Sequence, residues 1–351
     1  MRSLPLGTAD DSNTALVCSV TGQSFRICRE LGRGEQGVVY EVVDDEGVSL
    51  ALKVFFSSYS NNHILVEQRL RKLLLCGTPH LSFCWPLGVF CFPFFQVGSL
   101  GYTMPLIPSE FVPCSYIYNR SIYLRFLVVL RACQCLAEAF SHLHGKGFVY
   151  ADYSLNNIYI NPVNGRCLIV DVDNVCSLHE PSKLLGTSPF IAPELVNCMR
   201  HPDIHSELHS IAVLFFCLIF LRHPFRGRHL LFEKLGMPLS LEELREEGLC
   251  YILDRDVEFT FNEFATCENL FRLEKILPSK ITSAFRASFV EGLFNPLSRV
   301  SLSRWKTVFG EAIRMLDRCP SCGQEIFIIP DIPDTLFVCW FCRATHPPIL
   351  R

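Results

Sequence analysis

The pattern of apolar and polar positions near the N-terminus predicts strands joined by short turns. Residues 38–43 form a β-branched run, residues 44–47 (Asp-Asp-Glu-Gly) read as a turn, and residues 48–56 form a second apolar run. A glycine-rich stretch at 31–37 comes directly before them. The order strand, glycine loop, strand, turn, strand predicts a β-hairpin flap and not the strand–helix unit that a dinucleotide fingerprint requires.

Later stretches change to helical periodicity. Residues 60–75 and 121–144 are predicted to form amphipathic helices, while residues 81–107 predict two or three further strands. The apolar run inside 208–221 is too short to cross a bilayer, so it predicts a buried core helix. Residues 222–315 are mixed and mainly helical in pattern. Strands followed by helices predict an α+β chain.

Composition narrows the class of protein. The chain has 351 residues, of which 49% are hydrophobic, so it can bury a large core. Its net charge of −3 argues against a dedicated nucleic-acid binder. Residues 1–24 are polar and are predicted to be flexible. Because they show no secretory signal pattern, the 18 cysteines indicate reduced thiols and a cytoplasmic setting.

Two charged side chains fall on apolar faces of the first predicted elements. Alternation along 48–56 places Lys53 among small and apolar residues. Glu67 lies at helical spacing between Ile64 and Leu70, and an inward carboxylate needs a cation. The sequence therefore predicts a Lys53–Glu67 ion pair. The alternatives are a lysine that reaches the surface and a solvated glutamate at the edge of the helix.

A loop between two apolar runs carries Asp152 and Asn157, five residues apart. Taken alone, such residues are usually turn formers. A further acidic residue, Asp171, follows the next apolar run, and an Ala-Pro-Glu sequence stands at 192–194. With the glycine loop, Lys53 and Glu67, these pieces fall in one order.

That order resembles the protein kinase superfamily over residues 25–315, with similarity to bacterial-type Ser/Thr kinase-like proteins that carry a C-terminal zinc ribbon. The resemblance implies a two-lobed fold, with a β-rich N-lobe over 25–107 and a mainly helical C-lobe over 108–315. It also implies ATP and Mg²⁺ as cofactors and a protein Ser or Thr hydroxyl as phosphoryl acceptor. The residues that it places around the nucleotide are Gly32, Gly34, Gly37, Val39, Ala51, Lys53, Glu67, Met104, Ile107, Asn157 and Asp171.

Individual roles follow from the same resemblance. Asp152 would accept the proton of the substrate hydroxyl, and Asn157 and Asp171 would hold magnesium. Gly32, Gly34 and Gly37 would cover the phosphates, Lys53 would hold them, Val39 would contact the adenine, and Met104 would lie at the back of the pocket before a hinge at 105–107. The resemblance also pairs Glu194 with Arg299 and makes Glu207 the anchor of the catalytic loop.

Five positions depart from the family pattern, and two of them are Tyr150, which replaces a histidine, and Val172, which replaces a phenylalanine. Ala151 replaces an arginine, so we expect activity that does not depend on phosphorylating Ser182 or Thr187 in the following segment. Ser154 replaces a lysine and Asp173 replaces a glycine. These changes leave open an alternative function, a pseudokinase that acts as a nucleotide-binding or protein-binding scaffold.

Four cysteines near the C-terminus form two C-x2-C pairs, Cys319/Cys322 and Cys339/Cys342, with sixteen residues between the pairs. This spacing predicts a structural zinc ribbon over residues 319–345, with disulfides as the alternative. So small a module depends on the metal for its folding energy. Because it carries few basic residues and several aromatic ones, we expect it to dock on protein and not on nucleic acid.

Overall fold

The computed structural model of the chain describes residues 15–17, 23–56, 63–91, 100–178, 190–196, 201–225, 251–253, 270, 272–328 and 337–346. These divide into two compact units. The first unit contains residues 1–109 together with 170–173, and the second contains 110–169 and 174–351. The predicted boundary between the lobes, at 107/108, lies two residues before the division at 109/110. The segment that holds Ser182 and Thr187, and the predicted helix at 241–248, lie outside the described residues.

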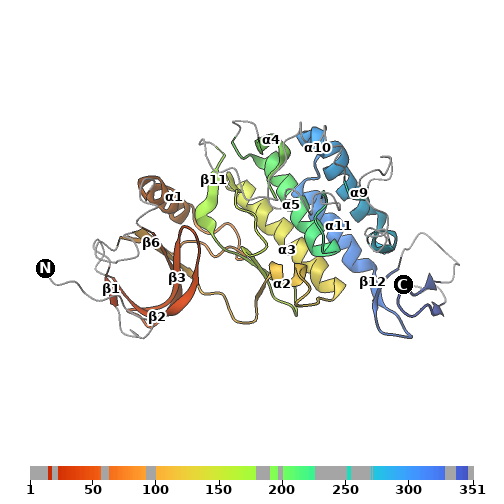
Figure 1. Cartoon of the computed structure of the whole chain (residues 1–351), viewed down its shortest axis with the longest axis horizontal. Helices are drawn as coiled ribbons and strands as arrows, with labels where there is room; N and C mark the ends of the chain where they lie inside the picture. Colours follow the sequence, from red (N-terminus) through yellow and green to blue (C-terminus); the bar gives the residue numbers. More distant parts are fainter. Residues whose placement is uncertain are drawn as a thin grey trace. The chain divides into compact units, whose positions relative to one another are not determined.

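The first unit is built on a six-stranded antiparallel sheet in the order β1-β2-β3-β4-β6-β5 (Figure 1). Helix α1 (His63–Cys76) contacts β5 and β6. The strands of this sheet are β1 (Ala15–Val17), β2 (Ser24–Arg33), β3 (Gly37–Asp44), β4 (Ser49–Phe55), β5 (Gly88–Cys91) and β6 (Leu100–Pro105). The predicted flap is thus confirmed as β2, β3 and β4.

One side of this sheet buries an apolar cluster. Its fully buried members include Phe25, Val38, Val42, Leu52 and Val54. Leu52 and Val54 are two residues apart on β4, as period-two alternation requires. The opposite side of β4 therefore carries the residues at odd positions, including Lys53.

The turn between β3 and β4 is formed by the residues that the sequence predicts. The Asp44 carboxylate accepts hydrogen bonds from the backbone of Glu46 (3.0 Å) and Val48 (2.8 Å). Gly47 has a φ of +83°, a conformation that glycine adopts without a steric penalty. Side-chain capping and a glycine together fix the register of the hairpin.

The prediction that residues 1–24 are entirely flexible is wrong. Residues 15–17 (Ala-Leu-Val) form β1 and pair with residues 24–26 of β2. The short apolar run supplies backbone hydrogen bonds along the edge of the sheet. The strand was not predicted because its three apolar residues stand within a mainly polar segment.

The second unit has helices α3, α5 and α11 at its centre. Helix α3 contacts both α5 and α11, and the three lie side by side in Figure 1. The described helical segments are α2 (Cys114–Tyr118), α3 (Phe126–Gly145), η2 (Val172–Asn174), α4 (Pro193–Val196), α5 (Ile204–Phe220), α9 (Ser279–Arg286), η3 (Ala287–Glu291), α10 (Gly292–Phe294), η4 (Pro296–Ser298) and α11 (Leu302–Met315). The short strands are β7 (Val112–Pro113), β8 (Phe148–Tyr150), β9 (Ile158–Ile160), β10 (Cys167–Ile169), β11 (Val175–Ser177), β12 (Leu316–Arg318), β13 (Glu325–Phe327), β14 (Phe337–Val338) and β15 (Thr345–His346).

Helix α5 is buried along almost its whole length, as its continuous apolar sequence predicts. It begins with a reciprocal cap, in which Asp203 accepts from the Ser206 backbone (2.7 Å) and Ser206 Oγ accepts from the Asp203 backbone (2.9 Å). It ends at Leu221 in a left-handed conformation, with a φ of +52°. The predicted core helix is confirmed, beginning four residues before the expected position.

Helix α3 is the one described helix that is long and apolar enough to span a membrane by length and composition. More than half of its most apolar window is buried within the protein, as expected of a core helix. This feature is therefore weak support for a membrane span.

The predicted Glu194–Arg299 ion pair is confirmed. The Arg299 guanidinium donates to both carboxylate oxygens of Glu194, at 2.5 and 2.8 Å, and both side chains are buried. Arg299 also donates to the backbone carbonyls of Gly292 and His205. This bidentate pair joins the start of α4 to the loop before α11.

Candidate active site and metal centre

The face of the sheet opposite the apolar cluster brings together most of the predicted nucleotide residues of the first unit. In the strand register, Val39 pairs with Gly32 on one side and with Lys53 on the other, and Ala51 pairs with Met104. Directly paired residues point to the same side of a sheet. Ile107 follows β6 and is half-buried.

The three glycines of the flap have two different structural roles. A side chain at Gly37 would place its Cβ 2.2 Å from the Val54 carbonyl oxygen, so packing against β4 requires a glycine there. A Cβ at Gly32 or Gly34 would meet open space. The Gly34 backbone donates to the Gly37 carbonyl at 2.9 Å, which closes the turn. Gly32 and Gly34 therefore leave the backbone open to an approaching group.

Lys53 is buried and paired with two carboxylates of the first unit. Its Nζ lies 3.1 Å from Asp171 Oδ1, 3.0 Å from Asp173 Oδ1 and 3.1 Å from Asp173 Oδ2. Burial opposes the charge of Lys53, but the carboxylates of Asp173 and Asp171 outweigh it and raise its pKa above the ordinary value. Lys53 is therefore a fixed buried cation and does not reach the surface.

The predicted Lys53–Glu67 ion pair is wrong. Glu67 is partly exposed and pairs with Arg71, four residues further along α1, at 2.7 Å. The apolar stripe of α1 consists of Val66, Leu70 and Leu73, whereas Ile64 is 71% exposed. One residue on a helix turns the side chain by about 100°. The prediction centred the stripe on Ile64 instead of Val66, and Glu67 was placed on the wrong face.

Asp171 follows β10 in a left-handed backbone conformation, with a φ of +52°. Aspartate tolerates this region better than most side chains. Its side chain is 32% exposed, so part of the carboxylate is accessible. Carboxylate oxygens are ligands that a hard cation such as Mg²⁺ prefers. The Asp171 carboxylate therefore fits the predicted role of a magnesium ligand.

Asp152 and Asn157 lie together in the loop between β8 and β9. Asn157 Nδ2 donates to the Asp152 carbonyl at 3.0 Å, and Asn174 Nδ2 donates to Asp152 Oδ2 at 2.9 Å. Because Asn157 Nδ2 is engaged with Asp152, Oδ1 is the atom that Asn157 can offer to a metal. Ser154 shapes the turn between them by accepting from the backbone of Asn156 and Asn157.

Glu207 anchors this loop, as the sequence predicts. Glu207 Oε1 accepts from the Tyr150 backbone at 2.9 Å and from the Tyr153 hydroxyl at 2.6 Å. The other oxygen lies 2.6 Å from His144 Nε2. The rings of Tyr150 and Tyr153 pack edge to face, with centroids 5.2 Å apart. A buried carboxylate from α5 thus fixes the backbone two residues before Asp152.

The His144–Glu207 contact makes stability depend on pH. Burial lowers the pKa of His144, but the Glu207 charge and hydrogen bond outweigh it and raise the pKa above 6.5. The contact therefore stabilises the fold fully when the pH is below the pKa that His144 has in the unfolded chain. The stabilisation is lost as the pH rises through the higher pKa that His144 has in the folded protein. We expect the wild-type protein to have a higher free energy of unfolding than His144→Gln at pH about 6. This difference should become smaller as the pH rises. A constant difference in denaturant titrations across this window would contradict the assignment.

The sequence did not reveal the contacts of three side chains, two in the first unit and one in the second. Asp173 was noted only as a departure from a family pattern, yet it contacts Lys53. Tyr102 donates to Asp173, and Asn174 holds Asp152. The sequence offered one indication of these contacts. Residues 171–174 contain three polar side chains directly after the apolar run at 167–170.

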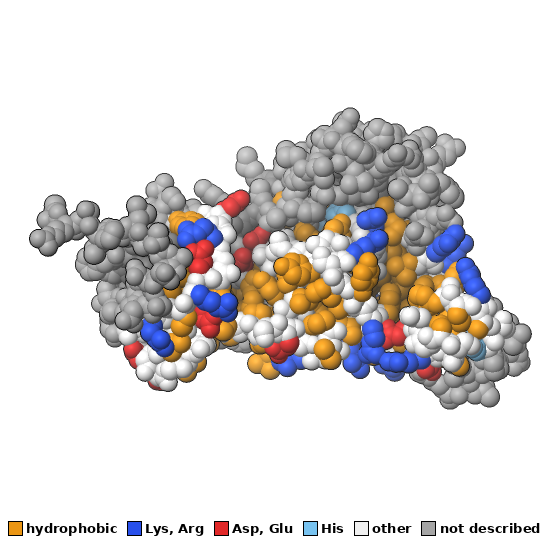
Figure 2. Space-filling model, turned by 60° about the horizontal axis from the view of Figure 1, so that its bottom comes forward, with side chains coloured by type: hydrophobic (Ala, Val, Ile, Leu, Met, Phe, Trp, Pro, Cys, Tyr) orange, Lys and Arg blue, Asp and Glu red, His pale blue; other side chains and the backbone are white. Residues whose placement is uncertain are grey.

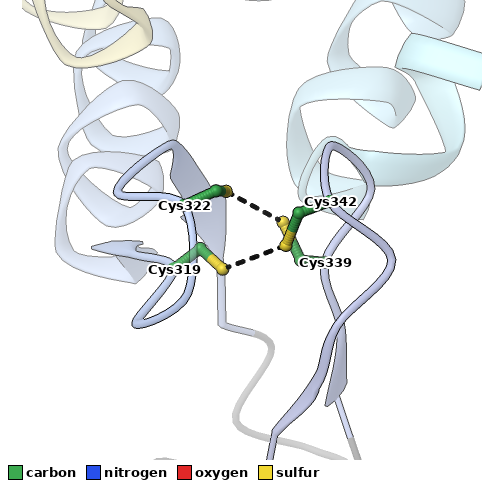
Figure 3. A group of neighbouring side chains, drawn as sticks. All are labelled: Cys319, Cys322, Cys339 and Cys342. Atoms are coloured by element: carbon green, nitrogen blue, oxygen red, sulfur yellow. Dashed lines mark hydrogen bonds between the residues drawn. The ribbon is translucent and has the colours of Figure 1, made fainter.

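The four C-terminal cysteines form a cluster that fits a metal ion. Figure 3 shows Cys319 and Cys322 on one loop facing Cys339 and Cys342 on another. All four Sγ atoms lie within 4.8 Å of one another, and the facing pairs are 3.7 Å apart. Tetrahedral Zn²⁺ with 2.3 Å Zn–S bonds places sulfur atoms about 3.8 Å apart. The cysteines are free thiols, so the predicted zinc ligands are brought together without disulfides.

The backbone around Cys319 favours the thiolate form of this one cysteine. Burial opposes ionisation of Cys319, but hydrogen bonds from the backbone of Cys322 and Ser321 outweigh it and lower its pKa to about 6. His346 Nε2 lies 3.3 Å from Cys319 Sγ, and this histidine is buried. A histidine that contacts a metal-binding cysteine helps to orient its sulfur atom and to shield it from water.

The cysteine module also contacts helix α3. Glu325 on β13 accepts from the backbone N–H of Leu127 at 3.0 Å. The rings of Phe126 and Phe327 pack edge to face, with centroids 5.4 Å apart. The N-cap residue of α3, Arg125, makes no capping hydrogen bond with its side chain. Glu325 therefore supplies the cap, and its charge is favourable at that end of the helix.

Figure 2 shows one face of the molecule coloured by side-chain type. On this face, the Lys and Arg side chains of the described residues lie in separate groups, with acidic and apolar side chains between them. Such a distribution differs from the continuous basic stripe of a nucleic-acid interface.

Comparison with known proteins found similarity to protein kinases. The family model described as "Protein kinase domain" matches residues 109–249. A Dictyostelium discoideum protein named "Probable serine/threonine-protein kinase gdt4" is 26% identical over 56% of this chain. The Saccharomyces cerevisiae protein "Probable serine/threonine-protein kinase RTK1" is 22% identical over 57% of it. A Drosophila melanogaster cGMP-dependent protein kinase is 32% identical over 26% of it. The matched regions cover only 12%, 33% and 10% of those three proteins.

Proposed function

We propose that this chain, which matches the protein kinase domain model over residues 109–249, transfers the γ-phosphoryl group of ATP to Ser or Thr hydroxyls of a protein. The observation that carries the proposal is the geometry around Asp152. Its carboxylate is half-buried, its Oδ2 is held by Asn174, and its backbone is fixed by Asn157. A carboxylate held in this way is suited to accept a proton from a hydroxyl group.

The remaining residues supply binding and orientation. Lys53 is a buried cation suited to phosphate oxygens, and the open backbone at Gly32 and Gly34 suits close approach of a phosphate. Asn157 Oδ1 and the Asp171 carboxylate each offer an oxygen of the kind that Mg²⁺ binds, and Mg²⁺ would neutralise charge on the phosphates. Val39, Ala51 and Met104 offer an apolar surface to the adenine, because they lie on the face of the sheet that carries Lys53.

We also propose the cytoplasm as its setting and protein as its partner. The described cysteines are free thiols, which supports a reducing compartment. The rings of Trp340 and Phe341 are 44% and 60% exposed on the cysteine module. Exposed aromatic side chains support protein docking there in preference to nucleic-acid binding.

A second candidate function, a nucleotide-binding or protein-binding scaffold without transfer, is favoured by one observation. In protein kinases the lysine that contacts the phosphates is paired with a helix glutamate in the active arrangement. Here Lys53 is held by Asp171 and Asp173, and Glu67 pairs with Arg71. A chain fixed in this arrangement would bind a partner without transferring phosphate.

Replacing Asp152 distinguishes the two functions. With labelled ATP, Mg²⁺ and a generic protein acceptor, we expect transfer by the wild-type protein and a loss of about 10²- to 10⁴-fold in Asp152→Ala, because the variant lacks the base. Asn156→Ala, at an exposed position in the same loop, is the matched control and should retain the wild-type rate. Nucleotide binding with no transfer in any of these proteins would support the scaffold.

A further inference from the structure

We propose that Asp173, and not Glu67, is the carboxylate that orients Lys53 toward phosphate, with Tyr102 holding Asp173 in place. The inference rests on the proposed function, because it assigns a positioning residue to the same site. The four residues involved in the contacts, Lys53, Tyr102, Asp171 and Asp173, all belong to the first unit.

The contacts of Lys53 are the first argument. An ammonium group has three N–H donors and no acceptor. Three carboxylate oxygens lie within 3.1 Å of Nζ, and two of them belong to Asp173. Asp173 thus holds Lys53 through both oxygens, while Asp171 holds it through one. Asp173 is the main determinant of where the ammonium points.

The burial of the two carboxylates separates their roles. Asp173 has a side-chain exposure of 3%, whereas that of Asp171 is 32%. Removing the cation from a buried carboxylate leaves an uncompensated charge, which is strongly unfavourable. Asp171 can release Lys53 to solvent, a metal or a phosphate at lower cost. Asp173 therefore remains with Lys53 when a nucleotide binds, and Asp171 is the residue that exchanges.

Tyr102 fixes Asp173 from the neighbouring strand. Its hydroxyl donates to Asp173 Oδ1 at 2.7 Å. Tyr102 on β6 pairs with Lys53 on β4, so the two side chains project from the same side of the sheet. The tyrosine is fully buried, and its ring packs near Phe55, with centroids 6.1 Å apart. The sheet therefore positions both the cation and the donor that holds its carboxylate.

Glu67 cannot have the same role in this arrangement. It lies outside the buried stripe of α1 and is held by Arg71 at i+4. Asp173, in contrast, stands where the family pattern has a glycine, a residue with no side chain to offer. The chain has thus gained a carboxylate at one position and left the helix glutamate on a partly exposed face.

Three substitutions test the inference by nucleotide binding as well as by transfer. Asp173→Asn keeps the shape and removes the charge, Tyr102→Phe removes one hydrogen bond, and Glu67→Gln alters the residue that the family pattern would select. We measure the Kd for Mg·ADP by calorimetry, together with KM for ATP and kcat. Hydrogen bonds to charged groups are the stronger kind, so we expect Asp173→Asn to raise Kd and KM by about tenfold or more. Tyr102→Phe should raise them by about threefold to tenfold, and Glu67→Gln by less than about twofold.

A purely structural role for Asp173 would lower the thermal midpoint without changing the Kd of the folded protein. If Asp173→Asn fails to fold, Tyr102→Phe gives the same test in a milder form. A loss of affinity in Glu67→Gln that equals or exceeds the loss in the other two variants would overturn the inference while leaving the kinase function intact. Binding that depends on Asp173 in a protein without transfer would support the inference and reject the kinase function. A wild-type protein that binds no nucleotide would overturn both.

Discussion

An Asp171→Asn variant is expected to lose about 10²- to 10³-fold in the rate of phosphoryl transfer while keeping its fold. The substitution removes one negative charge and changes little else. Asparagine, like aspartate, tolerates the left-handed conformation that residue 171 adopts, with a φ of +52°. Its amide oxygen can still accept from Lys53. The expected loss therefore comes from weaker binding of Mg²⁺ and not from backbone strain.

The dependence of rate on magnesium concentration is the measurement that isolates this effect. We expect the residual activity of Asp171→Asn to require a higher Mg²⁺ concentration than that of wild type. Asp44→Asn is a matched control in the same unit, because Asp44 caps the β3–β4 turn through an oxygen that asparagine retains. Equal rates and equal magnesium dependence in wild type and Asp171→Asn would remove Asp171 from the metal site.

The sequence predicted the parts of the molecule that depend on short-range pattern. The β2–β4 flap follows from alternation and turn residues, and the burial of α5 follows from its uninterrupted apolar sequence. The cysteine cluster follows from the spacing of ligands within two tight loops. In each case the signal lies within a few residues of the structure that it forms.

Two long-range contacts, Glu194–Arg299 and the Glu207 anchor, were predicted only through the family resemblance. Spacing along the chain carries no information on which side chains meet across more than 50 residues. The resemblance supplied that information because the corresponding positions in the family are occupied by similar residue types. Glu207 retains a carboxylate where the family usually has aspartate, so the prediction was correct.

The same reasoning was wrong for Glu67, and the reason is geometric. The resemblance identified a glutamate in the right helix, but the phase of α1 is set by Val66, Leu70 and Leu73. The partner of Lys53 comes instead from Asp173, about 120 residues away in sequence. Sequence patterns do not show which of two carboxylates, Glu67 or Asp173, pairs with Lys53. Burial distinguishes them, and burial is known only from the structure.

Removing the metal from the cysteine module is expected to unfold it. Structural zinc sites contribute about 10–16 kcal/mol of binding free energy, which is also the folding free energy of such a module. We expect Cys319→Ser, or treatment with a chelator, to abolish bound zinc in metal analysis and to expose the module to proteolysis. Cys28→Ser, at an exposed cysteine far from the cluster in sequence, should keep the metal content of wild type.

Loss of the module should also weaken the second unit, because Glu325 caps α3. Glu325→Ala removes this cap while leaving all four cysteines in place, and we expect it to lower the free energy of unfolding by about 1 kcal/mol without releasing zinc. Cys319→Ser should lower it by at least as much, since the unfolded module no longer presents Glu325 or the Phe327 ring to α3. Unchanged unfolding of the α3 region in both variants would show that the cysteine module and the helical unit fold independently. A loss of zinc in Glu325→Ala would show instead that α3 contributes to holding the metal site together.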